Sequence, residues 1–327
     1  MFLYAVIAVI LIGLPLAGLL YQFAGKCRDR RRFPPLGRLI RVNGRGFHVL
    51  ERGSGPSVVL ESGIAGTSLS WTLVRDELAA RARVLSYDRA GLGWSDPPRE
   101  PRTLANAVDE LHLLLEAVAL PRPYVLVGHS YGGLIVRQFA SAYPKEVAGL
   151  VLVDPVESRE WLPLSDLQRR RLARGVLLSR RGALLARFGI VRFTLFLLIS
   201  GGRRLPRAIA RLSAGKGASV TERLTGEVRK LPPEMWPMVR MHWSDPKCFK
   251  TMADYLERLP ENVATAVATG FPSDVPTILL TAHDAHPIVP AGVVHRPSAK
   301  SGHWLQLDEP ELVINAVLEL LHLPTQD

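Results

Sequence analysis

The sequence predicts an α/β protein built on a mainly parallel sheet. Short apolar runs of strand length, such as residues 57–61 and 124–127, alternate with segments of helical periodicity, such as residues 103–120. The alternation stops after Asp154-Pro155 and resumes at Pro276. An insertion between two strands of a parallel sheet predicts a cap above their carboxyl ends, where open α/β sheets keep their sites.

The individual elements follow from residue 38 onward. Strands are expected at 57–61, 83–88, 124–127, 147–153 and 276–281, after two short strands over 38–52 that turn at Asn43-Gly44. Helices are expected at 70–80, 103–120 with Thr103 as N-cap, 132–143 and 311–321. We therefore divide the folded part into a core at 33–155 and 271–327 and a helical cap at 156–270, inserted after the sixth strand.

An apolar segment precedes this core. Residues 2–24 carry no charged side chain, and about 20 such residues span a bilayer as a helix. Basic residues follow at 26–32, whereas a cleaved signal peptide would place them before the apolar stretch. We expect residues 1–32 to form a single-pass membrane anchor, with the following domain on the cytoplasmic side because of the basic flank.

The positive charge of the chain is concentrated in the predicted cap. Residues 155–270 hold 21 Lys and Arg against 10 Asp and Glu, an excess that equals the formal net charge of +11 of the whole chain. An anionic membrane surface is the partner that this charge favours. A solvated Arg-rich helical face is the alternative. No zinc-finger spacing or aromatic RNA-binding strand motif is present, so no nucleic-acid partner is expected.

A candidate nucleophile lies between a predicted strand and a predicted helix. The segment Gly128-His129-Ser130-Tyr131-Gly132 has the Gly-x-Ser-x-Gly pattern of a nucleophile elbow. In such an elbow the serine sits at a strained turn, and the flanking glycines avoid collisions. A serine-containing tight turn is the structural alternative. The strand–turn–helix context favours Ser130 as the nucleophile.

A serine needs a base and an orienting acid, which follow it along the chain in this arrangement. His303, in Ser301-Gly302-His303-Trp304, is the candidate base, and Asp284, after the strand at 276–281, is the candidate acid. Asp154, at the end of the preceding strand, is the alternative acid. His283 and His286 flank Asp284, but no further ligands stand at zinc-type spacing, so no metal is expected.

Acyl transfer also requires two N–H donors for the developing oxyanion. The Tyr131 N–H, next to the nucleophile, is one candidate. The other is the Ile64 N–H in Ser62-Gly63-Ile64-Ala65-Gly66, the loop after the strand at 57–61. A simple turn is the alternative interpretation of this loop.

These motifs together resemble the α/β-hydrolase superfamily over residues 38–323. The segments that carry the resemblance are LESGIAG, YDRAGLGWSDPP, YVLVGHSYGG, VAGLVLVDP, PTILLTAHD and SGHW. The resemblance implies an esterase, lipase or amidase mechanism without a cofactor, and a structural role for Asp88-Arg89-Ala90-Gly91. Ser62 stands where the family usually has His.

The function expected from these observations is hydrolysis of lipophilic carboxylic esters, with no obligate protein partner. Haloperoxidase-like perhydrolysis, carbon–carbon bond hydrolysis and acyl transfer use the same triad and stay open. Epoxide hydrolases and haloalkane dehalogenases of this fold need a carboxylate nucleophile, which Ser130 disfavours. A non-enzymatic binding protein would be expected to lack members of the triad.

Overall fold

The computed structural model of the chain describes Tyr4, residues 9–200 and residues 228–322. The chain divides into two compact units. One consists of residues 35–174 and 254–327 and contains the sheet. The other consists of residues 1–34 and 175–253 and is helical where it is described. The predicted boundaries of the cap, 156 and 270, therefore differ from the limits of the helical unit.

The sheet has eight strands in the order β1-β2-β4-β3-β5-β6-β7-β8. Its strands are β1 (Arg38–Val42), β2 (Arg45–Arg52), β3 (Ser57–Glu61), β4 (Arg83–Tyr87), β5 (Tyr124–His129), β6 (Val147–Val153), β7 (Thr277–Thr281) and β8 (Val293–Pro297). β2 pairs antiparallel with β1 and with β4, and every other pair is parallel. The parallel order places the carboxyl ends of β3, β5, β6 and β7 at one edge of the sheet.

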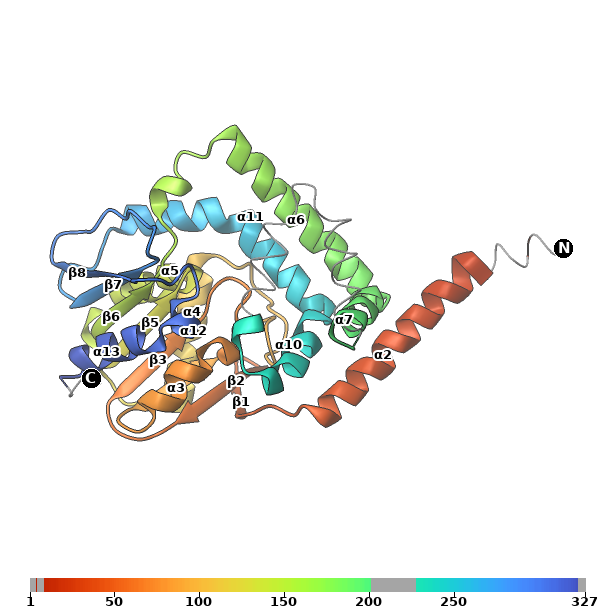
Figure 1. Ribbon diagram of the computed structural model, residues 1–327, viewed down its shortest axis with the longest axis horizontal. Coiled ribbons are helices and arrows are strands. Elements are labelled where there is room, and N and C mark those ends of the chain that lie inside the picture. Colours follow the sequence, from red (N-terminus) through yellow and green to blue (C-terminus); the bar gives the residue numbers. More distant parts are fainter. Residues whose placement is uncertain (1–3, 5–8, 201–227, 323–327) are drawn as a thin grey trace. The chain divides into compact units, whose positions relative to one another are not determined.

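Helices cover both faces of this sheet (Figure 1). In the sheet-containing unit they are α3 (Thr72–Leu78), α4 (Leu104–Val118), α5 (Tyr131–Ala142), α12 (Leu305–Asp308) and α13 (Pro310–Leu320). The side chains of the inner strands point alternately to one core beneath α4 and α5 and to another beneath α3 and α13. The continuous apolar runs of β3, β5 and β7 follow from this burial on both faces.

Several local predictions are confirmed. Asn43 and Gly44 have positive φ angles of 49° and 73°, as a two-residue hairpin turn requires. The Thr103 side chain accepts a hydrogen bond from the Asn106 N–H at 3.2 Å and caps α4. The strand β8 was not predicted; it is a short edge strand whose residues are all exposed or only partly buried.

Between β6 and β7 the described residues form helices. They are α6 (Asp166–Arg187), α7 (Ile190–Ser200), α10 (Trp236–Trp243) and α11 (Pro246–Thr269). Residues 201–227 of the predicted cap lie outside the described residues. The described part of the insertion after the sixth strand thus consists of helices joined by turns and loops, with no strand among its described residues.

The N-terminal segment contains a short π-helical turn at Val9–Gly13 and the helix α2 (Leu14–Arg32). None of the helices in the described parts of the chain combines the length and the apolarity that crossing a membrane requires. The expected transmembrane helix is therefore not found there, because α2 turns polar at Gln22 and strongly charged from Lys26 onward. Residues 1–3 and 5–8 of the expected anchor lie outside the described residues.

Candidate active site

Ser130 occupies a strained turn between β5 and α5. Its backbone has φ 53° and ψ −118°, a conformation that a non-glycine residue rarely adopts. The flanking glycines make room for the turn. A Cβ at Gly128 would lie 2.6 Å from Val136 Cγ2, and one at Gly132 would lie 2.5 Å from the Glu61 carbonyl oxygen. The predicted elbow is therefore present, and it sets Ser130 at the carboxyl edge of the sheet.

His303 is paired with Asp154. The His303 Nδ1 atom lies 2.7 Å from Asp154 Oδ2, and the Ala282 N–H donates to Asp154 Oδ1 at 3.0 Å. Burial alone would raise the pKa of Asp154, but the hydrogen bonds from His303 and from Ala282 outweigh it and hold this pKa below its usual value. An ionised Asp154 fixes the tautomer of His303 in which Nε2 is able to accept a proton.

The expected pairing of Asp284 with His303 is corrected by this geometry. The Asp284 side chain is 76% exposed, and its carboxylate lies 3.9 Å from His283 Nδ1. His283 in turn is tied to the Ser301 carbonyl through its own N–H at 3.0 Å. Asp154, the alternative acid, has the partner that Asp284 was expected to have: the Ala282 N–H holds its Oδ1 atom, and its Oδ2 atom lies against His303 Nδ1.

His129 joins the nucleophile elbow to the histidine loop. Its Nε2 atom lies 2.8 Å from the His303 carbonyl oxygen, to which a neutral imidazole donates. Burial, with a smaller contribution from His303, lowers the pKa of His129 to about 3, so the ring is neutral near pH 7. This contact was not predicted from the sequence, although His129 stands directly before Ser130 in the motif.

The loop after β3 approaches the nucleophile closely. A Cβ at Gly63 would lie 3.6 Å from Ser130 Cβ and 3.1 Å from His129 Nδ1. Gly63 is therefore the residue that brings this loop, and Ile64 with it, beside Ser130. Tyr131 is the first residue of α5, so its N–H belongs to the group that lacks an acceptor within the helix. Tyr131 thus follows Ser130 directly in the chain, and Ile64 follows Gly63, the residue at which the loop approaches Ser130. The use of their N–H groups as oxyanion donors stays a prediction.

A buried arginine holds the loop after β3. Arg89 is 3% exposed and donates hydrogen bonds to the carbonyl oxygens of Ser62 and Gly63. The carbonyl of Gly63 and the N–H of Ile64 belong to one planar trans peptide and point in opposite directions. Because Arg89 donates a hydrogen bond to the Gly63 carbonyl, it fixes the direction of the Ile64 N–H. From the sequence, Arg89 was expected to have only a structural role in its own loop.

The charge of Arg89 is balanced within the core. Arg89 forms an ion pair with Glu61, whose other carboxylate oxygen accepts from the Tyr87 hydroxyl. Burial raises the pKa of Glu61, and the neighbouring charge of Arg89 and the Tyr87 hydroxyl oppose that rise. The guanidinium also lies over the ring of Tyr131, 5.8 Å from its centroid. These contacts give Arg89 one position beneath the loop.

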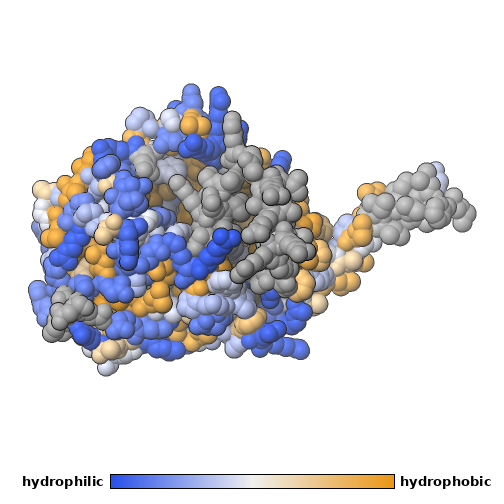
Figure 2. Space-filling model, in the orientation of Figure 1, coloured by the Kyte–Doolittle hydropathy of each residue, from blue (hydrophilic) through white to orange (hydrophobic). Residues whose placement is uncertain are grey.

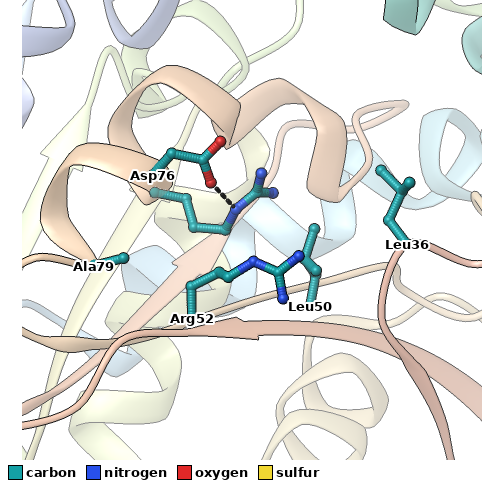
Figure 3. Close-up of a pocket in the computed structure, with 6 residues that line it drawn as sticks. Leu36, Leu50, Arg52, Asp76 and Ala79 are labelled. Carbon is teal, nitrogen blue, oxygen red and sulfur yellow. Dashed lines mark hydrogen bonds and ion pairs between the residues drawn. The ribbon is translucent and has the colours of Figure 1, made fainter.

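A separate hollow lies at the opposite edge of the sheet (Figure 3). It has a volume of about 350 Å³ and is lined by Leu36, Leu50, Arg52, Arg75, Asp76 and Ala79. Arg52 pairs with Val84 near the start of β4, whereas Ser130 follows the end of β5. None of the candidate catalytic residues lines this hollow. Among the described residues, no group of three or more His, Cys, Asp or Glu side chains is placed to hold a metal ion.

Comparison with known proteins gives matches in both sequence and structure. Residues 56–189 match the family model of the alpha/beta hydrolase fold. The uncharacterized protein YqjL of Bacillus subtilis is 35% identical over 116 residues, which are 35% of this chain and 46% of the relative. A protein of Gibberella zeae named for the AB hydrolase superfamily is 38% identical over 103 residues, 30% of this chain and 32% of the relative. The chain thus spans less than half the length of each.

The structural match covers more of the chain. The haloalkane dehalogenase DatA from Agrobacterium tumefaciens C58 aligns with 87% of this chain and 95% of its own, with a TM-score of 0.60 and 21% sequence identity. At this low sequence identity, the structural match shows a common fold and says nothing of a common activity. The eight-stranded sheet, the elbow after β5 and the family match over residues 56–189 agree with it. The chain therefore has the α/β-hydrolase fold.

Proposed function

We propose that this protein is a serine hydrolase that cleaves carboxylic esters of lipophilic acyl groups. Ser130 is the nucleophile, His303 the general base and then the general acid, and Asp154 the carboxylate that orients His303. The backbone N–H groups of Ile64 and Tyr131 form the oxyanion hole. The observation that carries the proposal is the strained Ser130 elbow together with the 2.7 Å pair of His303 and Asp154, to which His129 links it through the His303 carbonyl.

The chemistry proceeds in two acyl transfers. In the first, Ser130 Oγ attacks the ester carbonyl carbon while its proton passes to His303 Nε2, and the carbonyl oxygen becomes an oxyanion. Collapse of this intermediate breaks the ester C–O bond, and His303 returns the proton to the leaving alcohol. In the second, water loses its proton to His303 and attacks the acyl-enzyme, which releases the acid and restores Ser130.

The side chain at position 130 argues against a different reaction on this fold. Epoxide hydrolases and haloalkane dehalogenases form an ester between the substrate and a carboxylate of the enzyme. A serine in that position would leave an ether, which the hydrolytic half of such a mechanism does not cleave. The structural likeness to a dehalogenase is therefore a likeness of fold, and acyl transfer is the reaction that Ser130 supports.

The preference for lipophilic acyl groups is drawn from the apolar and basic character of the helices between β6 and β7. Each methylene buried on binding contributes about 0.8 kcal/mol, or roughly fourfold in affinity. If the acyl chain is bound on apolar surface, kcat/KM rises with chain length by up to that factor per methylene.

The test uses the purified full chain and a fluorophosphonate, which phosphonylates an activated serine. Intact-mass spectrometry is expected to find one added phosphonyl group in the wild type and none in Ser130→Ala. A series of p-nitrophenyl esters from acetate to decanoate then measures the chain-length dependence. A folded wild type that takes no label overturns the serine mechanism, and a rate that falls steadily from acetate onward overturns the lipophilic preference alone.

A further inference from the structure

The helix α2 turns its apolar side outward. The residues that it buries are Gln22, Gly25 and Asp29, which recur at spacings of three and four. Before the basic end of the helix the exposed side chains include Leu11, Ile12, Leu14, Leu16, Leu20 and Phe23. Figure 2 shows hydrophobic residues on the surface of this segment. A helix that faces water has the opposite distribution, with its apolar side packed against the protein.

The helix α7, in the same unit, repeats this distribution. Arg192 is buried, at 6% exposure, whereas Phe193 and Phe196 are 52% and 46% exposed. Ile190, one turn before Phe193, is also exposed. Two helices of one unit therefore bury polar groups and present apolar side chains to the surroundings.

The buried polar groups of the two helices hold each other. Arg192 Nε donates to Gln22 Oε1 at 2.9 Å, and the same guanidinium forms an ion pair with Asp29. Gln22 Nε2 donates to the Ser244 carbonyl oxygen at 2.8 Å. The contact is close, because a Cβ at Gly18 would lie 2.5 Å from the Phe188 carbonyl oxygen. The N-terminal helix is thus an integral part of the helical unit.

Small residues and interhelical hydrogen bonds are the contacts by which helices associate in an apolar solvent. There, lipid tails are as apolar as leucine, so apolar side chains gain nothing by turning inward. The surrounding that fits the outward faces of α2 and α7 is therefore the acyl region of a bilayer. A second copy of the chain is the other possible occupant of these faces.

Basic residues at the carboxyl end of α2 favour lipids with anionic headgroups. Arg28 and the run Arg30, Arg31 and Arg32 are exposed. Cations next to an apolar face favour an anionic lipid surface. We propose that the helical unit binds the surface of an anionic bilayer, with Leu20, Phe23, Phe193 and Phe196 among the acyl chains and the exposed arginines at positions 28 and 30–32 at the headgroups.

The test is flotation of the full chain with lipid vesicles. Wild type is compared with Phe193→Glu/Phe196→Glu on vesicles of phosphatidylcholine with phosphatidylserine. The control is Ile288→Glu, which changes a side chain of similar exposure, 58%, in the sheet-containing unit. We expect wild type and control to float, and the vesicle partitioning of the double variant to fall at least about tenfold. The variant Arg30→Gln/Arg31→Gln/Arg32→Gln is expected to lose the preference for phosphatidylserine over pure phosphatidylcholine.

Three outcomes overturn the proposal. Wild type stays at the bottom of the gradient with both kinds of vesicle, or the double phenylalanine variant floats as wild type does. In the third outcome, neither wild type nor the double phenylalanine variant floats, and sedimentation velocity finds wild type self-associated and the variant monomeric. That result would assign the apolar faces of α2 and α7 to contact with a second copy of the chain. Flotation requires no turnover, so its failure leaves the proposed serine mechanism standing, and the failure of that mechanism leaves the lipid surface standing.

Discussion

At the scale of single residues, the histidine before the nucleophile has a clear physical role. His129 is buried, neutral, and hydrogen bonded to the backbone of His303, the next histidine of the site. Its folded-state pKa of about 3 lies below the value of about 6.5 for an unfolded histidine. Between these two values the unfolded chain binds more protons than the folded chain. The stability that this difference provides is fully present above about pH 6.5 and is lost as the pH falls toward 3.

This linkage predicts the effect of His129→Gln. A glutamine keeps an N–H donor in the place of Nε2 but does not titrate. Between pH 6 and pH 4, the free energy of unfolding of wild type is expected to fall about 1 kcal/mol per pH unit more steeply than that of the variant. Urea denaturation followed by circular dichroism measures both slopes. Parallel slopes would show that His129 is not buried as a neutral ring.

In the proposed reaction, Arg89 acts through the backbone of a loop to which it does not belong. Its two hydrogen bonds, to the carbonyls of Ser62 and Gly63, use the planar fork of the guanidinium. A lysine at this position keeps the charge but has no fork that reaches both carbonyls. The direction of the Ile64 N–H would then no longer be fixed before the substrate arrives.

We therefore expect Arg89→Lys to lower kcat by about tenfold to a hundredfold and to change KM less than about threefold. The reason is that an oxyanion donor contributes to the transition state and not to the ground state. The matched control is Arg75→Lys, another buried arginine, which donates to Asp76 and the Ser68 carbonyl. Equal losses in both variants, or a loss confined to KM, would assign Arg89 to stability alone.

The choice between Asp154 and Asp284 as the partner of His303 could not be made from the sequence. Asp154 and Asp284 both follow buried apolar strands, β6 and β7, and both precede His303, so their order along the chain does not distinguish them. The choice depends on contacts distant in sequence. Asp154 has a positive φ of 41° and accepts from the Ala282 N–H, which aims its second oxygen at His303. No local pattern encodes that contact.

At the scale of elements, α2 and α7 are joined by an ion pair that water hardly reaches. The side chains of Arg192 and Asp29 are 7% and 4% exposed. Removing one partner leaves the other charge buried without compensation, which typically costs about 3–5 kcal/mol. Arg192→Ala is therefore expected to lower the free energy of unfolding of the helical unit by about 3 kcal/mol.

A double-mutant cycle with Asp29→Asn separates this pair from other effects of truncation. If the pair accounts for the loss, adding Asp29→Asn to Arg192→Ala restores part of the stability, because no unpaired charge is left. Thermal unfolding followed by circular dichroism in detergent measures the four proteins. Additive losses in the double variant would contradict a direct coupling between α2 and α7.

Strands were predictable from the sequence where all their residues are buried, and were missed where their residues are only partly buried. The inner strands β3, β5 and β6 are runs of buried apolar residues, and such runs have a clear pattern. The edge strand β8 was missed because it is short, at most partly buried and ends at Pro297. The expected membrane anchor at residues 1–32 was not found for another reason, which concerns the side of α2 that packs against other helices. Its buried positions are polar or glycine, so hydropathy alone does not predict that it packs with other helices.

At the scale of the whole molecule, the order of the strands determines which side chains meet. β5 lies between β3 and β6, so the loops that carry Gly63, Ser130 and Asp154 emerge from adjacent strands at one edge. The helical insertion after β6 leaves this arrangement intact, since β7 still pairs with β6 in parallel. The alternation of strands and helices made the sheet predictable. The pairing of Asp154 with His303 was not available from that alternation, because it is a contact between residues 149 positions apart.

The central claim is that Ser130 is activated by His303 and Asp154. The most direct measurement is the second-order rate of fluorophosphonate labelling in wild type, Asp154→Asn and Asp284→Asn. Replacing the orienting aspartate of such a triad typically costs about 10⁴ in rate. We predict a loss of about a thousandfold or more in Asp154→Asn and a change of less than about twofold in Asp284→Asn. A large loss in Asp284→Asn with a near-normal rate in Asp154→Asn would contradict the account.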